Sequence, residues 1–108
     1  MTPAEFAACV AREKEDLLAM YFDAGSGSAV AKKVESLRFT PEQKDGVKEI
    51  LDSALTDAFY TFLLALDGEA SLGGLQRTYE LRDEDGTLLT GGELEAAAWE
   101  VFHGKTSK

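Results

Sequence analysis

The segment that decides the fold is Thr40–Gly68, which reads TPEQKDGVKEILDSALTDAFYTFLLALDG. It opens with Thr40, Pro41 and Gln43, the start signal of a helix. The threonine hydroxyl can cap the first backbone amides, proline suits the first helical position, and the glutamine amide can reach back to the cap. These residues predict a long helix over residues 41–67.

Apolar residues recur every three or four positions along this segment, which places them in one stripe on a helix of about 39 Å. They are Val47, Ile50, Leu51, Ala54, Leu55, Ala58, Phe59, Phe62, Leu63 and Leu66. Tyr60 and Leu64 widen the stripe in its second half. We therefore expect other elements to wrap that half on most sides, with Gly68 closing the helix.

A similar start signal opens the chain, where Thr2 and Glu5 flank a proline. It predicts a helix over residues 3–23. A charged patch interrupts its apolar positions, so that Glu13 or Lys14 must occupy a place where the stripe would continue. This helix should therefore pack best at its two ends.

Glycine and serine dominate residues 24–28, which predicts a loop. Ser28 can then cap a short helix over residues 29–37. Its apolar residues Val30, Val34 and Leu37 share one face.

Residues 75–90 have the pattern of a β-hairpin. Leu75, Tyr79 and Leu81 fall on one side of an extended chain by their period of two. The sequence Asp83–Gly86 is typical of a tight turn, because aspartate bonds its own backbone and glycine accepts positive φ.

The last helix is predicted over residues 91–103, with Thr90 and Glu93 forming a third capping box. Together these elements predict one α+β domain over residues 1–108. It is mostly helical, with about four helices packed around the long central helix and one hairpin.

The chain has 108 residues and a formal net charge of −9. An acidic surface disfavours nucleic acid and anionic membranes, and it is compatible with a basic protein partner. The single cysteine, Cys9, leaves no internal disulfide, so we expect a cytoplasmic protein. Cys9 itself is expected to be a small buried residue of the first helix.

No catalytic motif stands out, and we expect no cofactor. The leading hypothesis is a non-enzymatic, acidic protein-binding module that masks a basic partner, in a regulatory or immunity-like role. Its expected contact residues are Asp83, Glu84 and Asp85 at the hairpin tip, together with Trp99, which does not align with the apolar stripe of its helix.

Two alternatives stay open. Glu100 and His103 form a Glu-x-x-His pair at helical spacing, as in carboxylate-bridged metal sites, which would make the chain a small enzyme or metal-binding protein. The other alternative is a homo-oligomeric structural module, for example a homodimer, that buries Trp99 and the widened stripe.

Three segments within residues 59–102 carry a resemblance: FLLALDG, YELRDEDGTLL and GELEAAAWEVF. They resemble small bacterial proteins of uncharacterised function that join a Leu-Asp-Gly helix end to a short acidic hairpin and a closing helix. Some bacterial proteins of this size and acidity are immunity partners of secreted toxins. The resemblance implies no role for any single residue.

Overall fold

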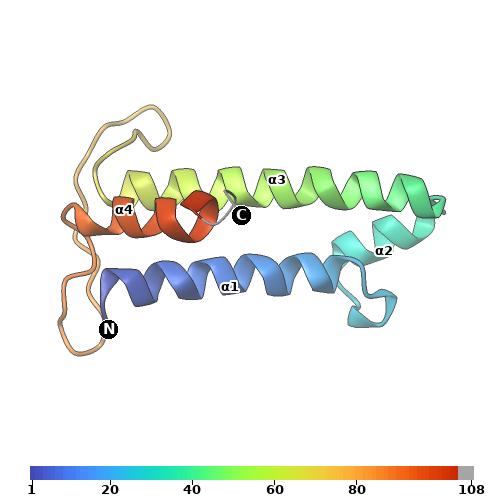
Figure 1. Ribbon diagram of the computed structural model, residues 1–108, viewed down its shortest axis with the longest axis horizontal. Helices are drawn as coiled ribbons and strands as arrows, with labels where there is room; N and C mark the ends of the chain where they lie inside the picture. The colour runs from blue at the N-terminus through green and yellow to red at the C-terminus, as the bar shows by residue number, and fades with distance from the viewer. Residues whose placement is uncertain (105–108) are drawn as a thin grey trace.

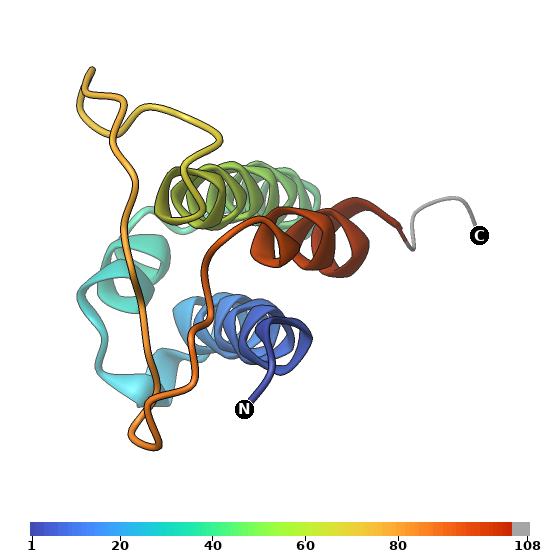
Figure 2. The same ribbon diagram turned by 90° about the vertical axis from the view of Figure 1, so that its left-hand side faces the viewer.

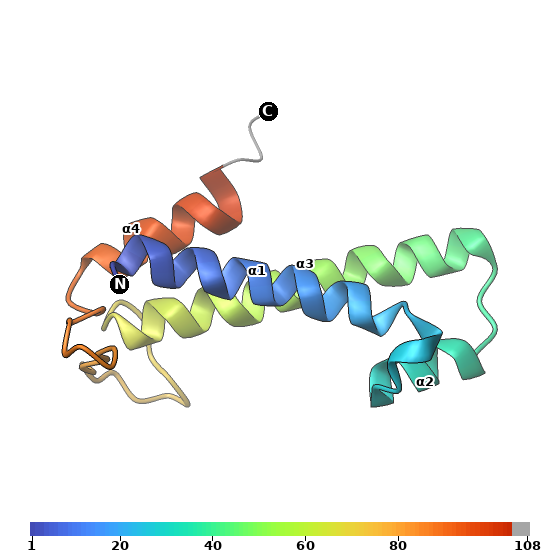
Figure 3. The same ribbon diagram turned by 90° about the horizontal axis from the view of Figure 1, so that it is seen from below.

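A computed structural model describes residues 1–104, and within them the chain is all-α. The elements are α1 (Pro3–Tyr21), a 3₁₀ turn (Ala24–Ser26), α2 (Ala29–Ser36), α3 (Pro41–Leu66), α4 (Glu93–Trp99) and a π-helical turn (Glu100–Gly104). Helices α1 and α3 run antiparallel along the longest axis, with α4 at one end and α2 at the other (Figures 1 and 3). The molecule is therefore elongated, with extents of 45 × 31 × 31 Å.

The helix starts follow the predicted signals. Thr2 and Glu5 form a reciprocal capping box at 3.1 and 2.8 Å, and Thr40 and Gln43 form a second one at 3.1 and 2.9 Å. The Ser28 hydroxyl accepts a hydrogen bond from the third residue of α2 at 3.0 Å. Each box satisfies amides that the first turn of a helix leaves without partners, so local sequence fixes where these helices begin.

The predicted β-hairpin is wrong, and with it the α+β class. The connecting segment, residues 67–92, has an irregular backbone between α3 and α4 (Figure 2). Two isolated bridges are the only β-pairing among residues 1–104, and they join Leu72 to Leu75 and Arg82 to Leu88.

The side chain of Thr90 explains why the pairing stops. Its hydroxyl accepts a hydrogen bond from the Leu81 backbone N–H at 3.2 Å and donates one to the Tyr79 carbonyl at 2.7 Å. A side chain thus makes the bonds that a second strand's backbone makes in a ladder. Residues 71–80 are exposed, so their apolar side chains are not buried against another element, and no burial stabilises a strand there.

The core lies at the α4 end of the molecule, where the first half of α1, the second half of α3 and α4 meet. Its buried members are Ala7, Leu63, Leu94, Ala98 and Phe102. Leu63 and Leu94 are the largest side chains that are fully buried. Three helices contribute to this cluster, so it holds the two ends of the chain together.

The α2 end is much less covered. Its buried apolar residues are Leu18, Ala31 and Val34. The expectation that other elements wrap α3 on most sides of its second half is wrong, because Phe62 is 47% exposed there, and earlier in the helix Ile50 is 68% exposed. Although α3 has 26 residues, neither it nor any other described helix is apolar enough over its length to cross a membrane.

Candidate functional site

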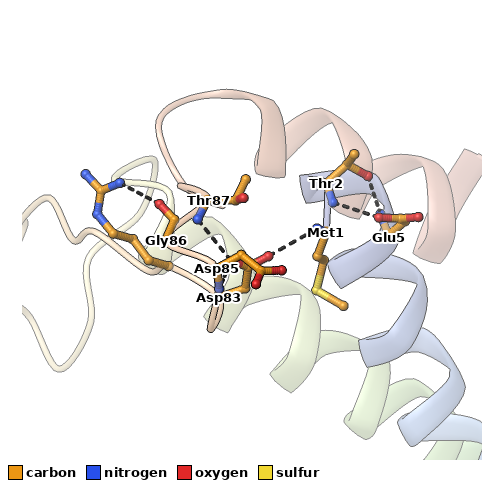
Figure 4. Close-up of polar contacts among 8 residues, drawn as sticks. Met1, Thr2, Glu5, Asp83, Asp85, Gly86 and Thr87 are labelled. Atoms are coloured by element: carbon orange, nitrogen blue, oxygen red, sulfur yellow. Dashed lines mark hydrogen bonds and ion pairs between the residues drawn. The ribbon is translucent and has the colours of Figure 1, made fainter.

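The acidic tip expected to bind a partner is partly used by the fold itself. The Asp83 carboxylate accepts hydrogen bonds from the backbone N–H groups of Asp85 and Thr87, both at 2.9 Å, and pairs with the amino group of Met1 at 3.1 Å (Figure 4). The Thr87 hydrogen bond, followed by the contact with the amino terminus, holds the pKa of Asp83 below its ordinary value. Asp83 therefore fixes the tip to the start of α1, and Glu84 and Asp85 are the acids that remain exposed there.

Trp99 lies at a different place in the fold. The tip lies beside the amino terminus, whereas Trp99 ends α4 and packs on α3 through Tyr60 (Figures 1 and 2). The structure therefore does not bring the four expected contact residues together into one site.

An aromatic cluster surrounds Trp99. The Tyr60 ring meets the Trp99 ring edge-on with centroids 6.4 Å apart, and meets the His103 ring at 90° and 4.7 Å. The Trp99 and His103 rings lie 4.8 Å apart. Trp99 is still 53% exposed, so the cluster holds a large aromatic surface in place while leaving it open to a partner.

A groove of about 340 Å³ opens beside this cluster, between α1, α3 and the π-helical turn. It is lined by Lys14, Asp52, Ser53, Thr56, Asp57, Phe102 and His103. A second groove of about 280 Å³ lies on the other side of Lys14 and Phe102, which line both. These two side chains therefore form a ridge, with the acids Asp52 and Asp57 on the side that also holds His103.

The sequence predicted that Glu13 or Lys14 interrupts the apolar stripe of α1; Lys14 is the buried one of the two, and Glu13 is exposed. The Lys14 ammonium contacts the carboxylates of Asp52 at 2.6 Å and Glu15 at 3.1 Å, and donates to the Thr56 hydroxyl at 3.1 Å. Burial acts to lower the Lys14 pKa, but the hydrogen bonds to Asp52 and Glu15 outweigh it and raise the pKa above its ordinary value. Lys14 therefore keeps its charge inside the fold, where the Asp52 and Glu15 carboxylates stabilise it.

Glu100 and His103, the pair of the metal-binding alternative, both lie in the π-helical turn. His103 packs its ring against Tyr60 and Trp99, and the Glu100 carboxylate occupies the space next to the Gly104 α-carbon. Residues 1–104 contain no group of three or more histidine, cysteine, aspartate or glutamate side chains that could hold a metal ion.

Asp67, the residue that ends α3, has a structural role. Its carboxylate accepts hydrogen bonds from the backbone N–H groups of Gly91 at 2.7 Å, Gly92 at 2.9 Å and Glu95 at 2.9 Å. The capping box predicted from Thr90 is therefore wrong, because an aspartate at the end of α3 caps α4 from a distance in sequence. A carboxylate there also interacts favourably with the helix dipole.

Cys9 is exposed on α1, so its expected burial is wrong. It lies on the side of the helix that faces away from the core, where the apolar stripe does not extend.

Comparison with known proteins adds nothing to this geometry, because no family model, curated protein or solved structure matches the chain. The resemblance to small bacterial proteins therefore stays a prediction.

Proposed function

We propose that this chain is a non-enzymatic protein-binding module, and that the groove beside Trp99 accepts a basic side chain from a protein partner. The observation that carries the proposal is the half-exposed Trp99 ring, held by Tyr60 and His103 next to a groove that contains two carboxylates. Rigid aromatic residues at a surface are typical anchors of protein interfaces.

The charges of the groove favour a cationic ligand. Lys14 is already paired with Asp52 and Glu15, which leaves the Asp57 carboxylate without an ion-pair partner among the contacts of residues 1–104. The whole chain carries a net charge of −9, which adds a long-range attraction for a basic partner. Arginine suits the site best, because its planar guanidinium stacks on aromatic rings and pairs with carboxylates.

Such a module can mask a basic surface of its partner, as regulatory and immunity-like proteins do. We propose a cytoplasmic location on the ground that the chain has one cysteine and no possible internal disulfide.

Trp99 is the single tryptophan of the chain, so its fluorescence reports directly on the groove. We expect a short acetylated and amidated Gly-Arg-Gly-Arg-Gly peptide to change the Trp99 emission in a saturable way at low salt. The effect should weaken as salt rises, because the attraction is screened. A matched peptide with glutamine in place of arginine should leave the emission unchanged.

Asp57→Asn should reduce the affinity for the arginine peptide severalfold, because it removes the carboxylate without changing the size of the side chain. Asp85→Asn is the matched control, since it removes an exposed acid at the tip. An affinity that falls in Asp85→Asn and not in Asp57→Asn would move the site to the tip and overturn the groove proposal.

A further inference from the structure

Helix α3 has a second apolar surface, here called the outward face, that the described elements cover only in part: Val47, Leu51 and Leu55 are half-buried and its other members are exposed. Its members are Val47, Ile50, Leu51, Ala54, Leu55, Ala58 and Phe62. Ile50 is 68% exposed and Phe62 is 47% exposed, and Ala54 and Ala58 between them are exposed as well. None of these seven residues is buried, although they make up most of the apolar stripe of the helix.

The opposite side of the same helix turns polar residues toward α1. Asp52 and Thr56 contact Lys14 of α1, and the next turn places Asp45 and Glu49 beside Leu18. In its first half, α3 therefore contacts α1 through polar side chains, while Ile50 and Ala54 lie exposed on its other side. This is the reverse of what a surface helix of a complete globular unit shows.

The outward face is also free of acidic residues, in a chain with twenty of them. A basic partner would need carboxylates around its contact surface. An uncharged apolar face with exposed alanines near its middle instead suits a second helix of the same kind, because small residues let two helices approach closely.

We infer that the outward face binds the outward face of a second copy of this chain, with the two α3 helices antiparallel. A two-fold axis at the level of Thr56 places Ala54 of one copy opposite Ala58 of the other. The same axis places Ile50 opposite Phe62 of the second copy. The large residues of each copy thus meet at the two ends of the contact, and the small ones meet at its centre.

The antiparallel direction is also favoured by charge. Lys44 lies at the margin of the outward face near the start of α3, and exposed Glu69 follows the end of the helix. The same two-fold axis brings Lys44 of each copy to the level of Gly68 of the other, next to Glu69. Each dimer then contains this opposite-charge pair twice.

Exposed leucines at both ends of α3 fit the same arrangement. Leu37, before α3, is 65% exposed, and Leu72 and Leu75, after it, are 40% and 60% exposed. Residues 69–75 rise beside the carboxyl end of α3 (Figure 1). An antiparallel partner brings its own α2–α3 corner to this end, which covers leucines that one copy leaves in solvent.

The dimer should be reversible, because one helix face with its two ends gives an interface near the low end of the range for specific complexes. We expect a dissociation constant of about 10–100 µM. Each copy carries a net charge of −9, so added salt should strengthen the dimer by screening the repulsion between the copies. Binding of an arginine peptide in the groove should respond to salt in the opposite direction, so one proposal can fail while the other holds.

Sedimentation velocity of the full chain across the micromolar range tests the inference. Ala54→Glu should keep the chain monomeric at all concentrations, because it puts a charge at the centre of the contact. Ala8→Glu, at an exposed alanine of α1, should dimerise like the unchanged chain. A chain that stays monomeric at high concentration and high salt, or an Ala54→Glu variant that still dimerises, would overturn the inference.

A cross-linking experiment tests the direction of the helices. In a Cys9→Ser background, a mixture of Ala54→Cys and Ala58→Cys chains should form the mixed disulfide between the two variants upon mild oxidation. Parallel helices would instead join like to like and would refute the antiparallel arrangement. Lys44→Glu should weaken the dimer, and adding Glu69→Lys should restore it; no restoration would contradict the charge pairing.

Discussion

The two halves of α3 have the same kind of sequence and different surroundings. In the second half, Leu63 is 1% exposed, because α1 and α4 both pack against it. In the first half, Ile50 is 68% exposed, since α1 meets the polar side of the helix there. An apolar stripe thus predicts a helix reliably, but which part of the stripe becomes core depends on how many neighbours reach it.

The largest effect on stability is expected when an apolar residue of α3 is truncated in its second half instead of its first. Leu63→Ala should lower the free energy of unfolding by about 2–5 kcal/mol, because it opens a cavity in the buried cluster to which α1, α3 and α4 all contribute. Ile50→Ala should change it by less than about 0.5 kcal/mol in dilute, monomeric protein. Urea titrations of both variants make the comparison, and equal losses would contradict the assignment of the core.

The next effect concerns the cap that fixes α4 to α3. Asp67→Ala should cost about 1–3 kcal/mol, because three backbone N–H groups lose their acceptor in a partly buried place. Asp67→Asn keeps one side-chain oxygen and should lose less. Thermal unfolding of the two variants measures the difference, and an alanine variant as stable as the unchanged chain would show that solvent replaces the carboxylate.

Lys14 lies at the boundary between the two halves. Lys14→Met removes the buried charge and keeps the side-chain length. Asp52 and Glu15 remain exposed enough to be hydrated, so the free energy of unfolding at neutral pH should change by about 1 kcal/mol or less. The raised pKa of Lys14 stabilises the fold fully below the ordinary value of 10.5, and this contribution is lost as the pH rises through the higher folded value. Between neutral and strongly alkaline pH, the free energy of unfolding should therefore fall more steeply in the unchanged chain than in Lys14→Met. If it falls in parallel in the two proteins, the stabilising role of the lysine charge is refuted.

The smallest effect is expected at the tip of the connecting segment. The folded pKa of Asp83 lies below its ordinary value of 3.8, so its contribution is present above that value and is lost as the pH falls through the lower folded value. Asp83→Asn should lower the melting temperature slightly at neutral pH and have no effect in strong acid. A difference that persists in strong acid would mean that the side chain acts through packing instead of charge.

The sequence predicted the helices well and their surroundings poorly. Local signals such as the capping boxes at Thr2 and Thr40 act within one turn, and they are visible without the fold. The hairpin failed because a long-range contact, the Thr90 hydroxyl between Tyr79 and Leu81, replaces the ladder. A period-two pattern carries no information about such a bond.

The candidate site was predicted only in part. Trp99 was predicted as a contact residue because it does not align with its helix stripe, and the sequence predicted that either Glu13 or Lys14 places a charge in the stripe of α1. The groove beside Trp99 combines Lys14 with Asp57 and His103 because α1, α3 and the π-helical turn lie together there. No local sequence pattern encodes that arrangement. The binding role of Asp83 stays a prediction; its acidity suggested that role, and its contacts with the backbone and the amino terminus could not be read from the sequence.

Native-state hydrogen exchange tests most directly whether the two halves of α3 differ. At concentrations where the chain is monomeric, the amides from Phe59 to Leu66 should exchange only through global unfolding, and those from Val47 to Ala54 through easier local opening. Raising the concentration should protect the first half selectively, because the second copy then covers it. Equal protection along the whole helix in the monomer would contradict the account.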